Sequence, residues 1–336
     1  MMPALEEIRM ILHGKAMDIQ QLIEKHADLE DCHITRVMGT FVVVSNGRIV
    51  DMDRANELSY CPLQSIFSKG TIEDYVEFKM NEFGHFTPRR EIYRSSIEAP
   101  FGTSEMLMYA LSKKILDCAV VVCDGAGTVV TDNPGIVQGI GARMNGLFYT
   151  TPIEELRRRL EEEGCILSEN AEINQAQGVK AACMAGYRSI GVTLNTFYGG
   201  DPADIRQIGR ENGAKTVIAS LCSTGADKQR AEHVSRQSDL SWACASGYMR
   251  QEGSKALLQI TLGIPVFVFT TEGLEIIASY SDEDGASILL GPDKHEQRLV
   301  YSGSAGGREI LLGGKKLRIS SASLPVSGKH SPEPLT

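Results

Sequence analysis

Four of the eight cysteines stand where a thiol could take part in chemistry. Cys123, Cys222 and Cys244 each end or follow a run rich in β-branched and apolar residues, and Cys61 precedes a proline in a predicted loop. Thiolates bind soft metals and iron–sulfur clusters, and they act as nucleophiles where a helix N-terminus favours the charged form. Free cysteines are also among the most often buried residues, so packing in the core is the alternative for each of them.

A second group of residues could bind an anion. Residues 83–94 combine Arg89, Arg90, Arg94 and His85 with interleaved aromatic residues, in a chain that is acidic as a whole. Guanidinium groups bind carboxylates and phosphates through paired hydrogen bonds, so this segment predicts a clamp for a small anionic ligand. The alternative is a solvated loop whose arginines pair with nearby glutamates.

Glycine patterns give weaker evidence. Gly125-Ala126-Gly127 follows a predicted strand and Gly139-Ile140-Gly141 lies in a predicted helix, but neither completes the G-x-G-x-x-G fingerprint of dinucleotide sites. The chain also lacks a G-x-x-x-x-G-K-[ST] loop, an H-E-x-x-H helix, a G-x-S-x-G elbow and a C-x-x-C pair. P-loop NTPases, zincins, α/β-hydrolases and thioredoxin-like proteins therefore lose support.

The elements that would position these residues alternate between strands and helices. Such alternation is typical of an α/β fold with right-handed crossovers, and it predicts a mainly parallel sheet flanked by helices. We favour an open, doubly wound sheet over an incomplete barrel because several of the runs are short. The predicted strands are residues 118–124, 147–150, 165–168, 189–195, 214–222, 240–245 and 264–270, with predicted helices at 134–145, 152–163, 171–187, 202–212, 225–237, 247–260 and 272–279.

The regions before and after this alternation have their own patterns. Apolar residues at helical spacing predict one or two helices within 4–27, and Asn46-Gly47 predicts a two-residue hairpin turn. Thr71 with Asp74 predicts a capping box for a helix near 72–82. We therefore expect an N-terminal region at 1–100, an α/β domain at 101–280, a small antiparallel appendage at 281–325 and a disordered tail at 326–336.

The strand ends suggest where a ligand binds. In open parallel sheets and in barrels, ligands lie at the carboxyl ends of the strands. Cys123, Asn195, Cys244 and Thr271 each follow a predicted strand, so we expect them on one rim. We expect a cofactor at this rim to contact the side chains or backbone of Asp124, Gly125, Gly127, Asn195 and Thr271.

Charge and hydropathy exclude some functions. The net charge is −9, from 34 basic and 43 acidic residues, and no long basic run occurs, so nucleic-acid binding is not expected. The sequence contains no apolar run of the ~20 residues that a membrane-spanning helix needs. Its N-terminus does not resemble a signal peptide, which predicts a cytoplasmic protein with reduced thiols.

Several of these motifs together resemble the methanogenesis marker protein 8 family. The resemblance covers about residues 35 to 280 and is carried by the runs Cys61–Leu63, Ala119–Val129, Val137–Gly141 and Asp239–Ser246. It implies an archaeal protein with a role tied to methyl-coenzyme M reductase, in its maturation or activation. This chain departs from the family pattern in the residues after 280 and at Cys222, where a threonine is expected.

The departure at Cys222 leaves Cys61, Cys123 and Cys244 as the predicted ligands of a metal or an iron–sulfur cluster. Three thiolates would leave one position for a substrate or a partner's ligand, which fits an accessory protein. The alternative function is a small-molecule α/β enzyme that binds a carboxylated or phosphorylated metabolite. The sequence does not choose between them.

Overall fold

The computed structural model describes residues 18–62, 70–281, 289, 296–304 and 306–336, and within these ranges the strands form two sheets. The smaller sheet has four antiparallel strands in the order β3-β2-β1-β6. These strands are β1 (Cys32–Val37), β2 (Thr40–Ser45), β3 (Arg48–Asp53) and β6 (Gly146–Thr150). The sequence places residues 147–150 in the α/β sheet, which is wrong, because β6 pairs with β1.

The larger sheet contains 11 described strands in the order β14-β15-β13-β11-β12-β10-β9-β8-β4-β5-β7. In chain order they are β4 (Cys118–Cys123), β5 (Gly127–Thr131), β7 (Ile166–Leu167), β8 (Ser189–Asn195), β9 (Lys215–Leu221), β10 (Leu240–Trp242), β11 (Leu258–Ile260), β12 (Val266–Val268), β13 (Arg298–Tyr301), β14 (Arg308–Leu312) and β15 (Lys315–Ser321).

The sheet is parallel at its centre and between β11 and β13, and antiparallel elsewhere. β4, β8, β9 and β10 are parallel neighbours, whereas β5 and β12 run antiparallel beside them. The predicted α/β class is confirmed, but a mainly parallel sheet is not, because the sheet as a whole is mixed. The cause lies in the connections: β5 returns directly through the turn Asp124–Ala126, and β12 pairs with both β10 and β11.

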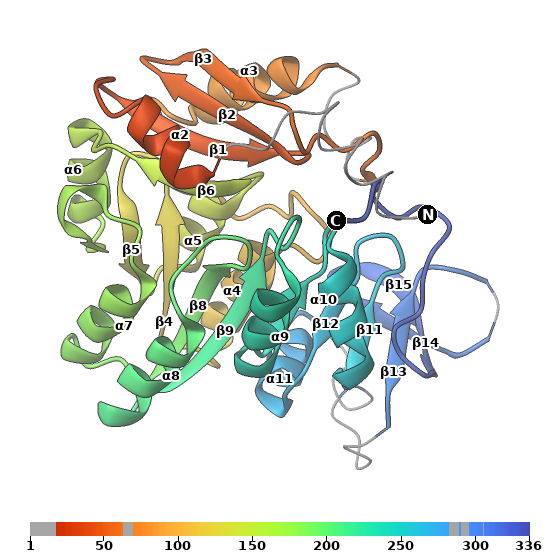
Figure 1. Ribbon diagram of the computed structural model, residues 1–336. Helices are drawn as coiled ribbons and strands as arrows, with labels where there is room; N and C mark the ends of the chain where they lie inside the picture. The colour runs from red at the N-terminus through yellow and green to blue at the C-terminus, as the bar shows by residue number, and fades with distance from the viewer. Residues whose placement is uncertain (1–17, 63–69, 282–288, 290–295, 305) are drawn as a thin grey trace.

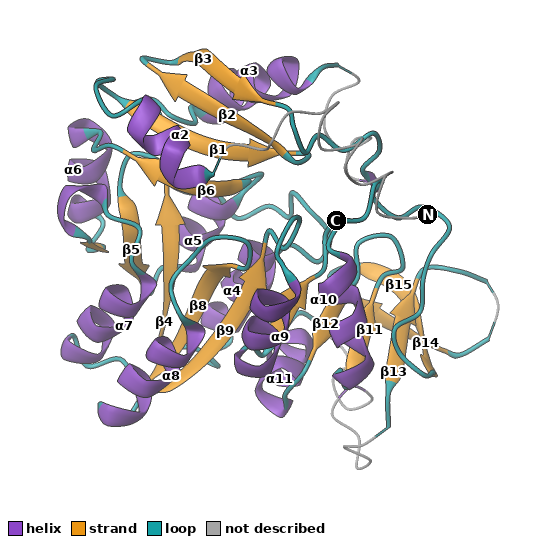
Figure 2. Ribbon diagram, viewed as in Figure 1, coloured by secondary structure: helices purple, strands orange, loops and turns teal. Residues whose placement is uncertain are grey.

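Helices cover both faces of the larger sheet, as Figure 2 shows. Alternate residues of β4 face opposite helix layers: Ala119 and Val121 belong to the cluster that includes α4, α5 and α11, and Cys118 and Val120 to the cluster that includes α7 and α8. The helices are α2 (Ile19–Lys25), α3 (Ile72–Phe83), α4 (Thr103–Ser112), α5 (Pro134–Gly141), α6 (Glu154–Glu162), α7 (Gln175–Met184), α8 (Pro202–Glu211), α9 (Lys228–Gln237), α10 (Gly247–Glu252) and α11 (Thr271–Ser279).

The strongest local signals of the sequence are confirmed. Asn46 and Gly47 have φ angles of 50° and 67° in the turn between β2 and β3. Thr71 and Asp74 form a capping box at the start of α3. Asn133 caps α5, with Pro134 in its first turn. Each of these patterns involves only a few neighbouring residues, so the local structure that it predicts does not depend on distant contacts.

The described strands after residue 280 belong to the larger sheet. β13 lies parallel to β11, so the predicted antiparallel strands β13 to β15 continue the larger sheet. Residues 282–288 and 290–295 of the predicted appendage lie outside the described residues, as does most of the predicted helix within 4–27. The tail that composition predicts to be disordered makes defined contacts, because Tyr60 pairs with Glu333 and the Gly247 N–H donates to the Thr336 carbonyl at 2.7 Å.

The two sheets meet at the carboxyl ends of the central strands. Figure 1 shows β4 and β9 pointing toward the smaller sheet, with β6 close to the end of β4. Among the described helices, none combines the length and the apolar character that crossing a membrane requires.

Gly139 provides a test of how α5 is packed. A Cβ atom at this position would lie 2.4 Å from the backbone carbonyl of Ile92, so the helix and the preceding segment approach too closely for a side chain. We expect Gly139→Ala to lower the free energy of unfolding by about 1–3 kcal/mol in urea denaturation. Gly200, whose Cβ position has no atom within 4 Å, is the matched control. Equal stability of the two alanine variants would contradict this packing.

Candidate functional site

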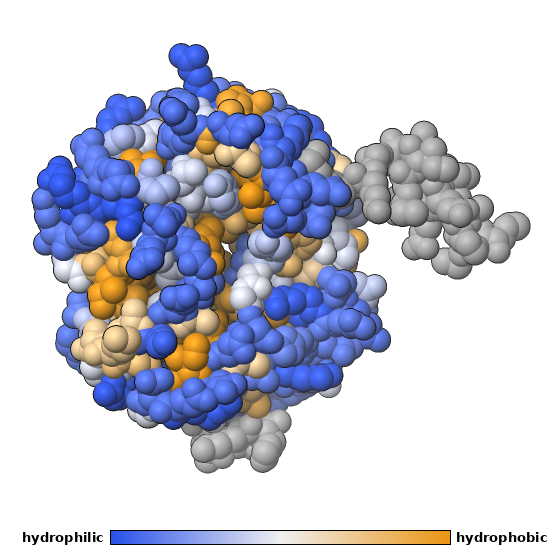
Figure 3. Space-filling view, turned by 60° about the vertical axis from the view of Figure 1, so that its left-hand side comes forward, coloured by the Kyte–Doolittle hydropathy of each residue, from blue (hydrophilic) through white to orange (hydrophobic). Residues whose placement is uncertain are grey.

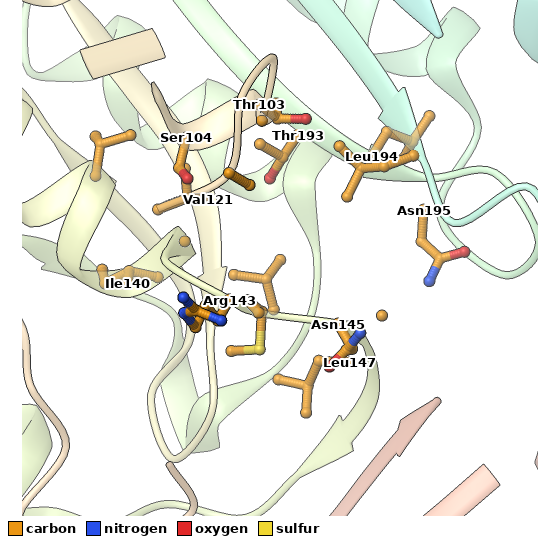
Figure 4. A pocket seen from close by; sticks show the side chains of 18 of the residues that line it. Thr103, Ser104, Val121, Ile140, Arg143, Asn145, Leu147, Thr193, Leu194 and Asn195 are labelled. Carbon is orange, nitrogen blue, oxygen red and sulfur yellow. The ribbon is translucent and has the colours of Figure 1, made fainter. Parts of the chain in front are cut away.

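A cavity of about 230 Å³ lies between the two sheets, at the carboxyl ends of β4 and β8. Figure 3 shows a hollow between the two halves of the molecule, with hydrophobic residues along its walls. The apolar lining of the cavity includes Val121, Ile140, Leu147 and Leu194, from β4, α5, β6 and β8 (Figure 4). Open α/β sheets bind their ligands at this edge.

Two asparagines present amide groups to the cavity. Asn195, the last residue of β8, accepts a hydrogen bond through Oδ1 from the Tyr198 N–H at 3.1 Å. Its Nδ2 is buried and has no hydrogen-bond partner in the described structure. Asn145, just before β6, accepts a hydrogen bond through Oδ1 from Lys79 Nζ at 2.6 Å. In each case the oxygen is already engaged, so the amide nitrogen is the group left to bind a ligand.

Gly146 keeps the space between these amides open. A Cβ atom at Gly146 would lie 3.1 Å from Asn195 Nδ2 and 3.1 Å from Cys222 Sγ. Figure 4 shows the Asn195 nitrogen pointing across the cavity toward Asn145. Both asparagines line the same cavity, and a side chain at residue 146 would occupy the space beside the Asn195 amide.

The cavity wall also contains an ion pair between Arg143 and Glu98. Arg143 Nε lies 3.1 Å from Glu98 Oε2, and Arg94 also bonds to this carboxylate. Burial raises the pKa of Glu98, but hydrogen bonds from Ser96, Arg94 and Arg143 outweigh it and leave the pKa below its ordinary value. This carboxylate therefore carries a charge that its arginines already balance.

Beneath the cavity lies a fully buried cluster of charged and polar side chains. Asp124 accepts hydrogen bonds from Arg90 Nε at 3.0 Å and from the Phe86 N–H. Burial opposes its ionisation, but Arg90 and His85 lower the pKa of Asp124 well below its ordinary value. Burial and the nearby Arg90 lower the pKa of His85 to about 3, so its ring is neutral. Arg90 and Asp124 thus form a buried ion pair beside a neutral histidine.

The predicted anion clamp is not assembled. Arg90 donates hydrogen bonds to Asp124 and to the carbonyl of Ile140, and Arg94 pairs with Glu91 and Glu98. Arg89 is exposed and His85 is buried. The prediction fails because the spacing of the arginines shows neither where each side chain points nor which carboxylates already neutralise it.

The three predicted metal ligands lie in different surroundings. Cys123 is in the hydrophobic core beside Cys165, Cys61 is close to Tyr75, and Cys244 lies against the backbone of Cys222. The described residues contain no group of three His, Cys, Asp or Glu side chains placed to hold a metal. Cys61, Cys123 and Cys244 therefore do not form the shared site that the sequence predicts.

A different pair of thiols does come together. Cys222 and Cys244 follow the parallel neighbours β9 and β10, and each thiol lies near the other and near Arg36. Burial, followed by the proximity of Cys244, raises the pKa of Cys222 to about 12. The Arg36 guanidinium lies 4.9 Å and 4.4 Å from the ring centres of Phe41 and Phe197.

The expectations about the strand ends are confirmed only for part of the rim. Cys123, Asn195 and Cys244 lie at one edge, because β4, β8 and β10 belong to the parallel centre. Thr271 lies at the opposite edge, since it follows β12, which is antiparallel to β10. Of the predicted cofactor-binding residues, only Asn195 lines the cavity.

Asp124, Gly125 and Gly127 have structural roles. Gly125 and Gly127 have φ angles of 77° and 71° in the turn between β4 and β5, and a strand follows them where a dinucleotide site would need a helix. Asp124 holds Arg90. These three residues therefore bring β5 back along β4.

Three residues of the site were not predicted from the sequence. Arg143 and Asn145 lie in the loop after α5 and match no motif. Lys79 lies on the buried face of α3, with Tyr75, Val76 and Met80. A lysine at the spacing of an apolar stripe is a signal that the sequence did contain.

The fold and cavity define an α/β protein with a small ligand-sized cavity where its central parallel strands end. Residues 33–281 match a family model described as an uncharacterised protein conserved in archaea, DUF2099. An uncharacterised protein of Methanocaldococcus jannaschii is 35% identical over 257 residues, which cover 74% of this chain and 89% of that relative. This chain belongs to the DUF2099 family.

The buried pair of Arg90 and Asp124 gives a sharp stability test. We expect Arg90→Ala to lower the free energy of unfolding by about 3–5 kcal/mol, because it leaves Asp124 as a buried charge without its partner. Arg89→Ala, one residue earlier and exposed, should change it by less than ~0.5 kcal/mol in the same urea titration. A loss below about 1 kcal/mol for Arg90→Ala would show that the pair does not hold this region together.

Proposed function

We propose that this protein binds a small organic molecule in the cavity between its sheets, and that the molecule has an apolar body and a terminal carboxylate or carbonyl oxygen. The observation that carries this proposal is the buried, unpartnered Nδ2 of Asn195. An unmet buried donor costs about 1–3 kcal/mol, and a ligand oxygen would remove that cost. Asn145, which also lines the cavity, supplies a second donor, because its Oδ1 already accepts from Lys79.

The rest of the cavity limits the size and polarity of the ligand. Its volume of about 230 Å³ is below the ~300–1,000 Å³ of sites for drug-sized molecules. Aliphatic side chains form much of its wall, which suits a short hydrocarbon body. A carboxylate fits better than a phosphate, because the lining guanidinium of Arg143 is already paired with Glu98.

Asn195→Asp tests the donor directly. The aspartate keeps the size of the side chain and can still accept from Tyr198, but it places an oxygen where the ligand oxygen would bind. We expect at least about a tenfold weaker binding of short aliphatic carboxylates and amides by calorimetric titration. Asn174→Asp is the control, because Asn174 caps α7 and aspartate caps a helix equally well. Unchanged binding in Asn195→Asp would refute the assignment of this amide.

A second candidate function follows from the resemblance to methanogenesis marker protein 8. In this candidate function, the protein assists the maturation or activation of methyl-coenzyme M reductase through a thiolate-bound metal or iron–sulfur cluster. The observation that favours it is the proximity of Cys222 and Cys244. Two thiolates supply half of a tetrahedral site, and a partner protein would supply the remainder.

Anaerobic purification tests this second candidate. Bound iron and sulfide with visible charge-transfer absorption should be lost in Cys222→Ser and Cys244→Ser and retained in Cys183→Ser, a buried thiol of α7. Retention of the metal in all three variants would exclude the thiol pair as its ligands.

A further inference from the structure

We propose that Lys79 is the counter-charge for the ligand, which is a carboxylate, and that its binding is coupled to the uptake of one proton by Lys79. This inference rests on the proposed function, since it concerns the same cavity. It adds the charge of the ligand and the residue that recognises that charge.

Lys79 is unusual because a lysine side chain is rarely buried completely without a charged partner. Its side chain is completely buried, and its Nζ lies 5.0 Å and 5.9 Å from the ring centres of Tyr75 and Phe86. Asn145 Oδ1, at 2.6 Å, is the hydrogen-bond acceptor that the structure records for it. A buried ammonium with one neutral acceptor is costly unless a negative charge is supplied nearby.

The charged and titratable groups around Lys79 do not supply that charge. Asp124 is the nearby carboxylate, and it is already paired with Arg90. Because those two charges balance and His85 is neutral, the cluster offers Lys79 no net negative charge. The phenol of Tyr75 is also neutral, since burial raises its pKa. Lys79 is therefore the uncompensated group of the cluster.

The cavity is where a compensating charge can enter. Tyr75 and Asn145, the two residues that contact the Lys79 ammonium on this side, both line the cavity. A carboxylate that accepts a hydrogen bond from Asn145 Nδ2 would have only this amide between itself and Lys79. In a dry cavity such a charge pair attracts strongly.

The direction of the pH dependence follows from the two states of Lys79. In the free protein, burial lowers the pKa of Lys79 to about 7. A bound anion favours the ammonium and raises this pKa. Below a pH of about 7 the affinity should be constant, because Lys79 is charged in both states. Above it, the affinity should fall by up to about tenfold per pH unit, because binding must then recover a proton.

Hexanoate and its neutral analogue hexanamide are the probes. We titrate each into the full chain by calorimetry between pH values of about 6 and 9, in buffers with different heats of ionisation. Hexanoate should bind with uptake of close to one proton per molecule at about pH 8.5, and its affinity should fall as the pH rises. Hexanamide should bind without proton uptake and with a constant affinity.

Variants identify the group that takes up the proton. Lys79→Met and Lys79→Gln should abolish the proton uptake and weaken hexanoate binding at about pH 6 by at least tenfold, with hexanamide binding retained. The glutamine variant keeps a donor for Asn145, and thermal melting shows whether each variant folds. Lys180→Met, at an exposed position of α7, is the matched control.

The outcomes separate this inference from the proposed function. Equal binding of hexanoate and hexanamide without proton uptake would overturn the role of Lys79 and leave the cavity as a binding site. Proton uptake that persists in folded Lys79→Gln would also overturn it. If neither probe binds, the proposed function fails, and this inference fails with it.

Discussion

The carboxylate of Asp124 is the group on which the arrangement around the cavity depends. It directly follows β4, and it accepts hydrogen bonds from Arg90 and from the Phe86 N–H. Arg90 also donates to the carbonyl of Ile140, so one buried ion pair joins a strand end, a connecting segment and the end of α5. A buried ion pair adds little net stability over apolar packing, but a fold that separates the two charges is strongly disfavoured. Lys79, which donates to Asn145 at 2.6 Å, lies near this pair.

The cavity combines a rigid frame with polar groups that the protein does not satisfy by itself. Its walls come from several helices and strands of both sheets, and each asparagine is oriented by a hydrogen bond to its Oδ1. Such preorganisation lowers the entropic cost of binding, because the protein does not have to order its site when a ligand binds. The unpartnered amide of Asn195 and the buried ammonium of Lys79 lie on different elements, and the carboxylate ligand that we propose would satisfy both.

Local signals in the sequence predict local structure well in this protein. The capping box at Thr71, the turn at Asn46-Gly47 and the limits of β8 depend on neighbouring residues, and the structure confirms them. Strand direction depends on distant pairing, so the position of Thr271 could not be predicted from its own surroundings. Side-chain direction has the same limit: Cys123 is at the predicted strand end, but its thiol faces the helix layer. Asn195 was predicted at the rim, whereas Asn145 was missed because its loop has no periodic pattern.

The most direct test of a carboxylate site is a crystal structure of the protein with a bromine-labelled aliphatic carboxylate. The anomalous signal of bromine locates the apolar end of the molecule without ambiguity. We expect the carboxylate oxygens to lie about 2.7–3.2 Å from the amide nitrogens of Asn145 and Asn195, with the bromine against Leu147 or Ile140. A carboxylate bound outside this cavity, or one that points away from both asparagines, would refute the proposed site.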